Sequence, residues 1–234
     1  MRDPWIDAVC WHNEKYLSGP VRGVVVSFHG LGGCYREEAS SLDLALAREN
    51  ILVVAPYYGQ ASWMNRAARQ FVDELLARVW QDRGFPDGMP LAAQGSSMGG
   101  AAALLYCRYG KRRPIGCDAA QPVCNTVLHF SERPDTASSL YLAYYGYPEP
   151  FDEVLREHSP LHQVKHMPDI PYFFSHGDAD RSVNKVLHSD AMVKALRGLG
   201  RRVEYLEVPG MGHGVNVPLE VLEKRRDFLT GLFR

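Results

Sequence analysis

The sequence predicts an α/β protein, with a doubly wound, mostly parallel sheet in a single domain that spans residues 1–234. Short apolar runs, several of them rich in β-branched residues, alternate with longer amphipathic segments along most of the chain. The stretches between successive runs are long enough for the right-handed crossovers that parallel strands require. No internal repeat, low-complexity tract or linker divides the chain, so one domain is the better count.

The individual elements follow from these patterns. The first expected strand, 21–28, is a valine-rich run that ends at a glycine-rich loop, and the second, 51–55, is closed by Pro56. Segments 34–49 and 63–82 carry apolar residues at helical spacing among charges, which favours amphipathic helices. The further expected strands are 91–94, 115–120, 171–176 and 203–208, and the further expected helices are 100–105, 184–199 and 219–233.

Two segments depart from the alternation. Residues 1–20 predict an antiparallel hairpin at one sheet edge, with strands at 8–12 and 15–17. Residues 121–169 form a long irregular insertion that is rich in aromatic residues and prolines, whereas connections in compact domains usually run about 2 to 6 residues. Long excursions of this kind tend to be binding loops or lids, so we expect an aromatic-rich insertion or lid here.

Composition excludes several classes of partner. The chain has 26 basic and 27 acidic residues and a net charge of −1, which gives no electrostatic reason to expect nucleic acid or an anionic membrane. The N-terminus lacks the apolar core of a signal peptide, and no apolar stretch approaches the roughly 18 residues that span a bilayer. Five cysteines without CxxC spacing predict reduced thiols, and we expect a cytoplasmic protein. The sequence carries no signal for its oligomeric state.

The most informative motif lies at residues 95–99, which read Gly-Ser-Ser-Met-Gly. This G-x-S-x-G pattern follows an expected strand and precedes a helix of small residues, the context in which it places a serine at a sharp strand-to-helix turn. The hydroxyl of the middle residue, Ser97, is then expected beyond the end of the sheet. A serine there needs an imidazole as general base, a carboxylate to orient the imidazole, and donors for the oxyanion.

An acid and a base follow Ser97 in that order, each just after an expected strand. Asp178 and Asp180 come after the strand at 171–176, and His213 lies in a glycine-rich loop after the strand at 203–208. Since the carboxyl ends of parallel strands meet at one edge of a sheet, we expect these side chains near Ser97. Asp180 is our preferred acid, and Asp178 stays open as a turn-forming alternative.

Two backbone N–H groups are candidates for the oxyanion hole. One is that of Met98, directly after the nucleophile, and the other is that of Leu31 in the glycine-rich loop after the first strand.

These residues resemble the α/β-hydrolase superfamily, and more narrowly the catalytic domain of the prolyl oligopeptidase family and its small esterase relatives. The matching pieces are His29-Gly30, Gly95-Ser96-Ser97-Met98-Gly99-Gly100, Ser159-Pro160-Leu161, His176-Gly177-Asp178-x-Asp180-x-x-Val183 and Gly212-His213-Gly214. The resemblance covers roughly residues 20–230. It implies an α/β-hydrolase fold with Ser97 as nucleophile, Asp180 as acid and His213 as base.

The resemblance also bears on the substrate. Peptidases of the family resemble two-part proteins in which a large propeller precedes the hydrolase, whereas only residues 1–20 precede the first expected strand here. We therefore expect a serine carboxylesterase that hydrolyses small carboxylic esters through an acyl-enzyme, without a cofactor. A small-peptide serine peptidase of prolyl-oligopeptidase type and an acyltransferase or thioesterase keep the same triad and remain alternatives. A non-catalytic binding module is disfavoured because no triad member is missing.

Further residues allow two interpretations. Tyr57, Tyr144 and Tyr145 are candidates for the substrate pocket, although aromatic residues at such spacing also serve as packing. His158, His162 and His166 recur every fourth residue, as metal ligands on one helix face would. Pro160 interrupts that spacing and no acidic or thiol ligand accompanies it, so we expect no metal site and histidines at the surface.

Overall fold

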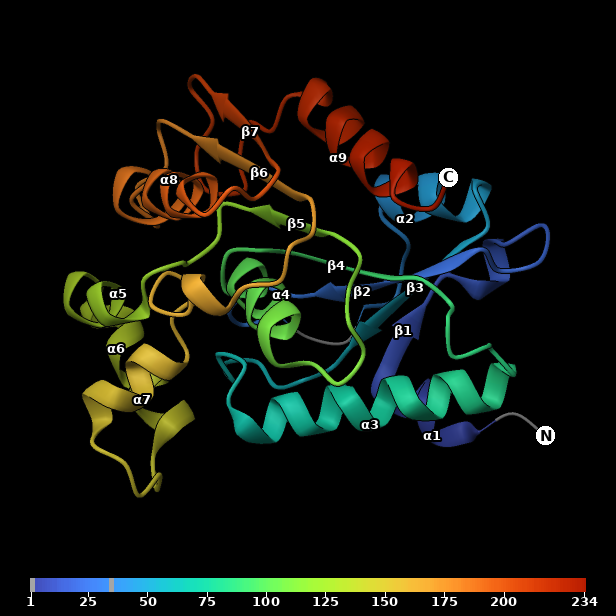
Figure 1. Ribbon diagram of the computed structural model, residues 1–234, viewed down its shortest axis with the longest axis horizontal. Helices are drawn as coiled ribbons and strands as arrows, with labels where there is room; N and C mark the ends of the chain where they lie inside the picture. The colour runs from blue at the N-terminus through green and yellow to red at the C-terminus, as the bar shows by residue number, and fades with distance from the viewer. Residues whose placement is uncertain (1–2, 34–35) are drawn as a thin grey trace.

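Within residues 3–33 and 36–234, which the computed structural model describes, seven strands form one central sheet (Figure 1). The strands lie in the order β1-β3-β2-β4-β5-β6-β7, and all neighbours pair in parallel except β1 with β3. This arrangement confirms the predicted α/β class and mostly parallel sheet. The strands are β1 (Cys10–His12), β2 (Gly23–Phe28), β3 (Ile51–Pro56), β4 (Leu91–Ser96), β5 (Cys117–Ala120), β6 (Tyr172–Gly177) and β7 (Val203–Val208).

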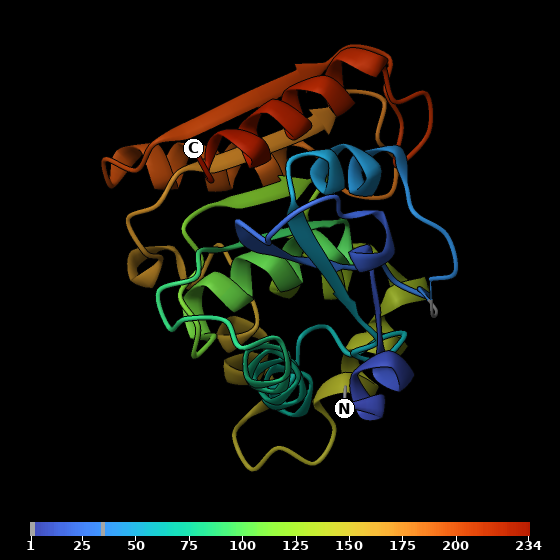
Figure 2. The ribbon, with the colours of Figure 1, turned by 90° about the vertical axis from the view of Figure 1, so that its right-hand side faces the viewer.

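Helices cover both faces of the sheet (Figure 2). Helices α2 and α9 pack together on one face, and α3, α4 and α8 pack on the other. No helix in the described part of the chain has the length and apolar character needed to cross a bilayer. The α-helices are α1 (Pro4–Val9), α2 (Ser41–Arg48), α3 (Arg66–Arg83), α4 (Met98–Tyr109), α5 (Thr126–Glu132), α6 (Pro134–Tyr144), α7 (Phe151–Glu157), α8 (Ala191–Gly198) and α9 (Leu219–Gly231).

The valine run in β2 shows why the strands read as continuous apolar stretches. Val24 and Val26 belong to the core shared with α3 and α4, while Val25 belongs to the core shared with α2 and α9. All three side chains are completely buried. A strand covered on both faces has no solvent side on which polar residues could alternate.

The N-terminal prediction was half wrong. Residues 10–12 form an edge strand, but residues 14–16 form a 3₁₀ turn, η1 (Glu14–Tyr16), instead of a second strand. The cause is Asn13, whose buried amide donates to the carbonyl of Ile51 and accepts from the N–H of Val53. These bonds attach the turn to β3, so β1 pairs antiparallel with β3 rather than with a hairpin partner.

The insertion at 121–169 is helical, not irregular as the sequence predicted. It contains α5, α6, α7 and a 3₁₀ turn, η2 (Val164–His166), which lie at one side of the sheet in Figure 1. Local capping explains two of the starts: the side chain of Asn125 accepts from the N–H of Leu128, and Pro134 occupies the first position of α6. That the insertion acts as a lid stays a prediction.

Helix α2 begins later than the sequence predicted. The expected helix at 34–49 starts at Ser41, where Ser40 and Asp43 form a capping box. Cys34, at the predicted start, lies outside the described residues. The other four cysteines are buried free thiols: Cys10, Cys107, Cys117 and Cys124.

Helix α9 is fastened to the sheet by one buried ion pair. Asp118 of β5 is fully buried, and its Oδ2 lies 2.8 Å from Nε of Arg225. The guanidinium also lies 3.4 Å from Oε1 of Gln94 in β4. Burial raises the pKa of Asp118, and the positive charge of Arg225 offsets part of that effect. The carboxylate therefore depends on Arg225 to remain charged inside the fold.

Replacing Arg225 with methionine should lower the free energy of unfolding by about 3 to 5 kcal/mol at pH 7, because it leaves a buried charge without a partner. The pKa of Asp118 then rises further, so the loss should shrink as the pH falls toward the unfolded-state pKa of about 3.9. Urea unfolding at several pH values measures both effects. Arg226→Met is the matched control, since Arg226 pairs with Asp227 at the surface and its loss should cost at most about 1 kcal/mol. Equal losses in the two variants would contradict the prediction.

Candidate active site

Ser97 occupies the turn between β4 and α4, with φ of 59° and ψ of −124°. The backbone around it is tightly packed. A Cβ atom on Gly95 would lie 2.2 Å from the carbonyl oxygen of Gly99, and one on Gly99 would lie 2.2 Å from the carbonyl oxygen of Phe28. Only glycine fits at these two positions. The turn thus presents Ser97 at the carboxyl end of β4 and the N-terminus of α4.

Three side chains from the loops after β4, β6 and β7 meet at this edge of the sheet. Oγ of Ser97 lies 2.9 Å from Nε2 of His213, and Nδ1 of His213 lies 2.7 Å from Oδ2 of Asp180. An ionised carboxylate only accepts, so Nδ1 donates to Asp180, and Nε2 accepts from the hydroxyl. Asp178, the alternative acid, instead accepts a 2.7 Å bond from the N–H of Gly210. The structure therefore brings Asp180, and not Asp178, to the imidazole.

Asp180 is a buried carboxylate surrounded by donors. Its Oδ1 accepts from the N–H groups of Ser182 and Val183, at 2.8 and 2.9 Å. Its Oδ2 faces His213 and also lies 3.2 Å from Nε2 of His176. Burial by itself would raise the pKa of Asp180, but the hydrogen bonds from His176, His213 and the Val183 N–H hold it well below the usual range. The group thus remains ionised at neutral pH.

His176 is a second histidine directed at this carboxylate, and its role was not predicted from the sequence. It is completely buried at the end of β6, with Nδ1 2.7 Å from the hydroxyl of Ser189. Its Nε2 lies 3.1 Å from the carbonyl oxygen of Val183 and 3.2 Å from Asp180. Both of these neighbours accept hydrogen bonds, so Nε2 carries the proton. The His-Gly pair at the end of the strand was the available signal in the sequence.

The two predicted oxyanion donors lie in the glycine-rich loop after β2 and at the start of α4, which face each other. Met98 is the first residue of α4, so its N–H has no partner in the preceding turn. A Cβ atom on Gly30, next to Leu31, would lie 3.8 Å from the Cβ of Ser97. Nδ1 of His29 lies 2.9 Å from the carbonyl oxygen of Gly30 and restrains that loop. The arrangement places both segments beside Ser97.

A cavity of about 410 Å³ opens beside Ser97. One wall comes from the insertion through His129, Arg133 and Thr136, which follow one another at i, i+4 and i+7. His129 belongs to α5 and Thr136 to α6, and Arg133 between them has a non-helical backbone with φ of −122° and ψ of 79°. This wall therefore forms where the two helices join, and no single helical periodicity in the sequence identifies it. The remaining lining residues are Gly30, Leu31, Trp63, Ser96, Ser182, Val183, His213 and Gly214.

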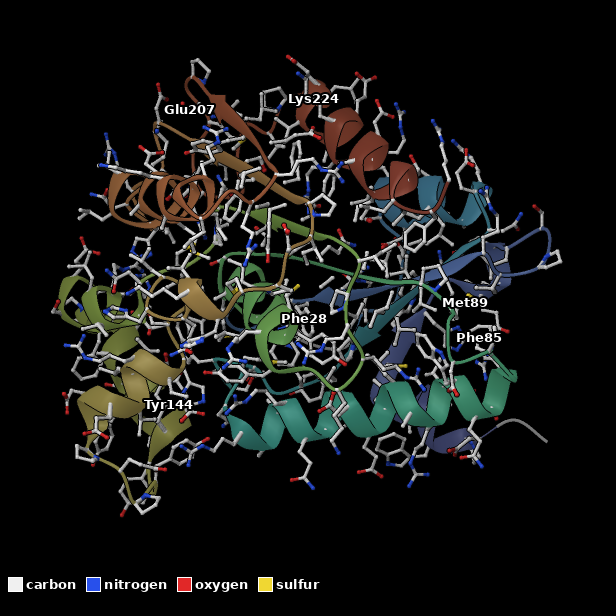
Figure 3. The ribbon with its side chains drawn as sticks, in the orientation of Figure 1. Phe28, Phe85, Met89, Tyr144, Glu207 and Lys224 are labelled. Atoms are coloured by element: carbon white, nitrogen blue, oxygen red, sulfur yellow. The ribbon has the colours of Figure 1, made fainter. Side chains whose placement is uncertain are left out.

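None of the three tyrosines proposed for the pocket lies among the described residues that line this cavity. Tyr144 is buried between α6 and α7, its ring 4.4 Å from that of His158 and its hydroxyl bonded to the carbonyl oxygen of Trp63 (Figure 3). Tyr57 and Tyr145 are 41% and 72% exposed. The prediction selected residues by type, whereas the insertion residues that line the cavity are a histidine, an arginine and a threonine at the junction of α5 and α6.

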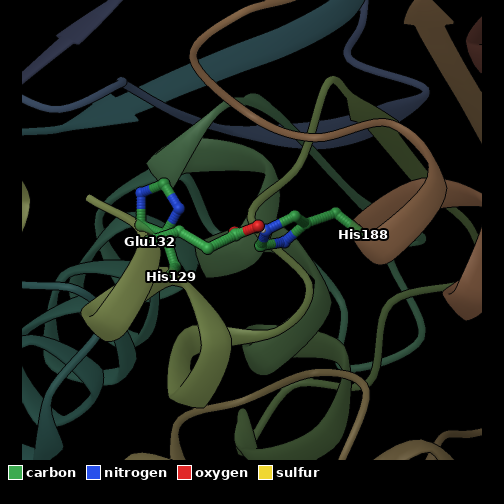
Figure 4. A group of neighbouring side chains, drawn as sticks. All are labelled: His129, Glu132 and His188. Atoms are coloured by element: carbon green, nitrogen blue, oxygen red, sulfur yellow. Dashed lines mark ion pairs between the residues drawn. The ribbon is translucent and has the colours of Figure 1, made fainter.

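A second polar cluster lies next to the cavity, with His129, Glu132 and His188 offering atoms within 4.8 Å of one another (Figure 4). Nδ1 of His188 accepts a 3.1 Å bond from the N–H of Asn125, so its neutral ring carries the proton on Nε2. That atom faces Glu132 at 3.6 Å. A metal ligand would need the Nε2 lone pair, so this arrangement fits a polar contact rather than cation binding.

His158, His162 and His166, which recur every fourth residue in the sequence, do not form a cluster in the structure. His158 is completely buried, not at the surface as expected, and its Nδ1 lies 2.8 Å from the carbonyl oxygen of Val154. His162 contacts the hydroxyl of Ser159, and His166 belongs to η2. The three residues do not share one helix, so their spacing does not align their side chains.

Fold and side chains together define a serine hydrolase of α/β-hydrolase architecture. The model of the prolyl oligopeptidase family matches residues 58–233, and the chain belongs to that family. No curated protein sequence matches it. Among solved structures, the acylaminoacyl peptidase of Pyrococcus horikoshii aligns with a TM-score of 0.77 at 14% identity, over 96% of this chain and 38% of the peptidase.

Two esterases also share the fold. A truncated carbohydrate esterase from gut microbiota aligns with a TM-score of 0.73 at 16% identity, over 92% of this chain and 87% of the esterase. Esterase B of Lactobacillus rhamnosis aligns with a TM-score of 0.72 at 17% identity, over 92% and 76% of the two chains. The chain thus spans well under half of the peptidase it resembles and most of these two esterases.

Substitution of the two aspartates after β6 should have very different effects on kcat. Asp180→Asn should lower kcat on the order of 10⁴-fold, the scale known for the equivalent change in another serine hydrolase, because the amide favours the wrong imidazole tautomer. Asp178→Asn should leave kcat within about 3-fold of the wild type, since the side-chain amide oxygen of the asparagine can still accept the hydrogen bond from the N–H of Gly210. Steady-state rates on an aryl ester measure both. A comparable loss in the two variants would argue against the assignment.

Proposed function

We propose that this protein is a serine carboxylesterase that hydrolyses small carboxylic esters through an acyl-enzyme. The observation that carries the proposal is the continuous contact from the Ser97 hydroxyl through His213 to the buried carboxylate of Asp180. A nucleophile, a base and an orienting acid in this sequence of contacts are what acyl transfer requires.

The chemistry follows from the groups present. The Ser97 oxygen attacks the ester carbonyl while its proton moves to Nε2 of His213, and Asp180 stabilises the imidazolium that forms. The N–H groups of Leu31 and Met98 stabilise the oxyanion. The imidazolium then gives its proton to the departing alcohol, which leaves an acyl group on Ser97. His213 next activates water, and the acid product leaves as the serine is restored. No step needs a cofactor.

The cavity supports an ester over a peptide with a free amino terminus. Among the described lining residues there is no carboxylate that could bind a substrate ammonium group. Arg133 is the one arginine or lysine among the described lining residues, and its guanidinium donates to both carboxylate oxygens of Asp135 and to the carbonyl oxygen of Ser182. The likeness to two esterases over most of their length agrees with this choice.

A peptidase acting on short peptides is the second candidate. Membership of the prolyl oligopeptidase family and the likeness to an acylaminoacyl peptidase favour it. An acylated peptide has no ammonium group to bind, so the lining alone does not separate these substrates. Matched aryl esters and arylamides with the same acyl group do: kcat/KM is expected to be higher for the esters, and the opposite order would favour the peptidase.

Ser97→Ala should lower the turnover of short-chain aryl esters by several orders of magnitude, on the scale of 10⁶ known for triad loss in another serine hydrolase. The measurement is the initial rate on p-nitrophenyl acetate and butyrate, with circular dichroism to verify folding. Ser131→Ala is the control, because Ser131 is exposed and bonds only its own helix through the carbonyl of Leu128. Retained turnover in Ser97→Ala would end the proposal.

A further inference from the structure

Gln121 has a strained backbone, although it belongs neither to the triad nor to the oxyanion hole. It directly follows β5, is 3% exposed, and has a φ of 46°. Residues with a side chain rarely adopt this left-handed conformation, and such strain persists only where the surroundings enforce it. The N–H of Gln121 donates to the carbonyl oxygen of Ser175 at 2.7 Å, which extends the pairing of β5 with β6 by one residue.

The side-chain amide of Gln121 bonds to the peptide groups on both sides of His213. Its Nε2 donates to the carbonyl oxygen of Gly212 at 2.6 Å, and its Oε1 accepts from the N–H of Gly214 at 2.9 Å. The two partners differ in kind, one an acceptor and one a donor, so only one orientation of the amide satisfies both. One buried glutamine thus holds the main chain before and after the imidazole.

Apart from the bonds to Gln121, the main chain of the loop after β7 that carries His213 is attached to other described segments only in its first part. Before His213, the carbonyl oxygen of Met211 accepts from the N–H of Ala179, and Gly210 bonds to Asp178, so this part is attached to the loop after β6. Beyond His213, residues 215–220 are exposed. In the described part of the chain, the bond from Gly214 to Gln121 is the one hydrogen bond that fastens residues 214–217 to another segment.

We propose that Gln121 is a positioning residue for the hydrolytic reaction, which fixes the main chain of His213 so that Nε2 lies at bonding distance from Ser97. The inference rests on the proposed function of the triad. Gln121 does not contact the reacting atoms, and its effect passes through the loop. A displacement of about 1 Å in a reacting group is enough to cost on the order of 10²-fold in rate. Gln121 is not among the described residues that line the cavity, so its replacement is expected to change kcat rather than KM.

Gln121→Asn gives the sharpest test. Asparagine keeps the amide and tolerates a positive φ better than most residues, but it is one methylene too short to reach both Gly212 and Gly214. We expect kcat to fall on the order of 10²-fold, with KM within about 3-fold and the melting temperature close to that of the wild type. Gln121→Met, which keeps the length and removes both hydrogen bonds, should show the same loss of kcat.

Gln94 provides the matched control. It is also a buried glutamine near the end of a central strand, but its side chain faces Arg225 on the opposite helical layer. Gln94→Asn should leave kcat within about 3-fold. The rate at which a fluorophosphonate labels Ser97 provides a readout independent of the ester, and the downfield proton resonance of the His213–Asp180 hydrogen bond reports the loop geometry directly. Both should change in Gln121→Asn and not in Gln94→Asn.

The outcomes separate this inference from the proposed function. If the wild type is labelled at Ser97 but hydrolyses no ester, the esterase proposal fails, while the labelling rates still test Gln121. Slow labelling of both Gln121 variants, with the fold intact, supports the positioning role. The inference is overturned if both variants keep kcat and labelling rate within about 3-fold. It is also overturned if their losses merely follow a fall in melting temperature that Gln94→Asn reproduces.

Discussion

The close approach of backbone segments at the ends of the central strands is the constraint on which the site depends. At the Ser97 turn, a side chain on Gly95 or Gly99 would meet main-chain atoms at 2.2 Å. The same situation recurs at the end of β6, where a Cβ on Gly177 would lie 1.9 Å from the carbonyl oxygen of Met211. The first contacts shape the turn after β4 and set it against the end of β2, and the last holds the end of β6 against the loop after β7 that carries His213.

Electrostatics in the site is organised around one negative charge. Asp180 is ionised and buried, with hydrogen-bond donors on both carboxylate oxygens. Two histidines of the cluster beside the cavity add no competing charge at neutral pH, because burial lowers the pKa of His129 to about 4 and that of His188 to about 3. A positive charge that develops on His213 therefore has a single buried counter-charge at 2.7 Å, where the protein screens it less than water would.

The sequence predicted the sheet, its crossover helices and the meeting of Ser97, Asp180 and His213, because each depends on a local signal. Strands covered on both faces appear as apolar runs, and the three polar residues each follow a strand end. The contribution of Gln121 left no such signal, since its partners are main-chain groups of loop residues 91 and 93 positions away. The cavity wall was missed for a related reason. It forms at the junction of α5 and α6, which the sequence did not predict, and residue type directed attention instead to Tyr144, which packs between helices.

The sequence separation of these contacts also bears on how the molecule assembles. The Ser97–His213 bond joins residues 116 positions apart, and Asp180 comes from a third region of the chain. Contacts of such long range form only after large loops have closed, later than the local helices. The turn at Ser97 itself depends on nearer contacts, with the end of β2 and with the carbonyl oxygen of Ala120 in β5. Reactivity at Ser97 therefore requires that β6 and β7 have joined the sheet, because the loops that follow them carry Asp180 and His213.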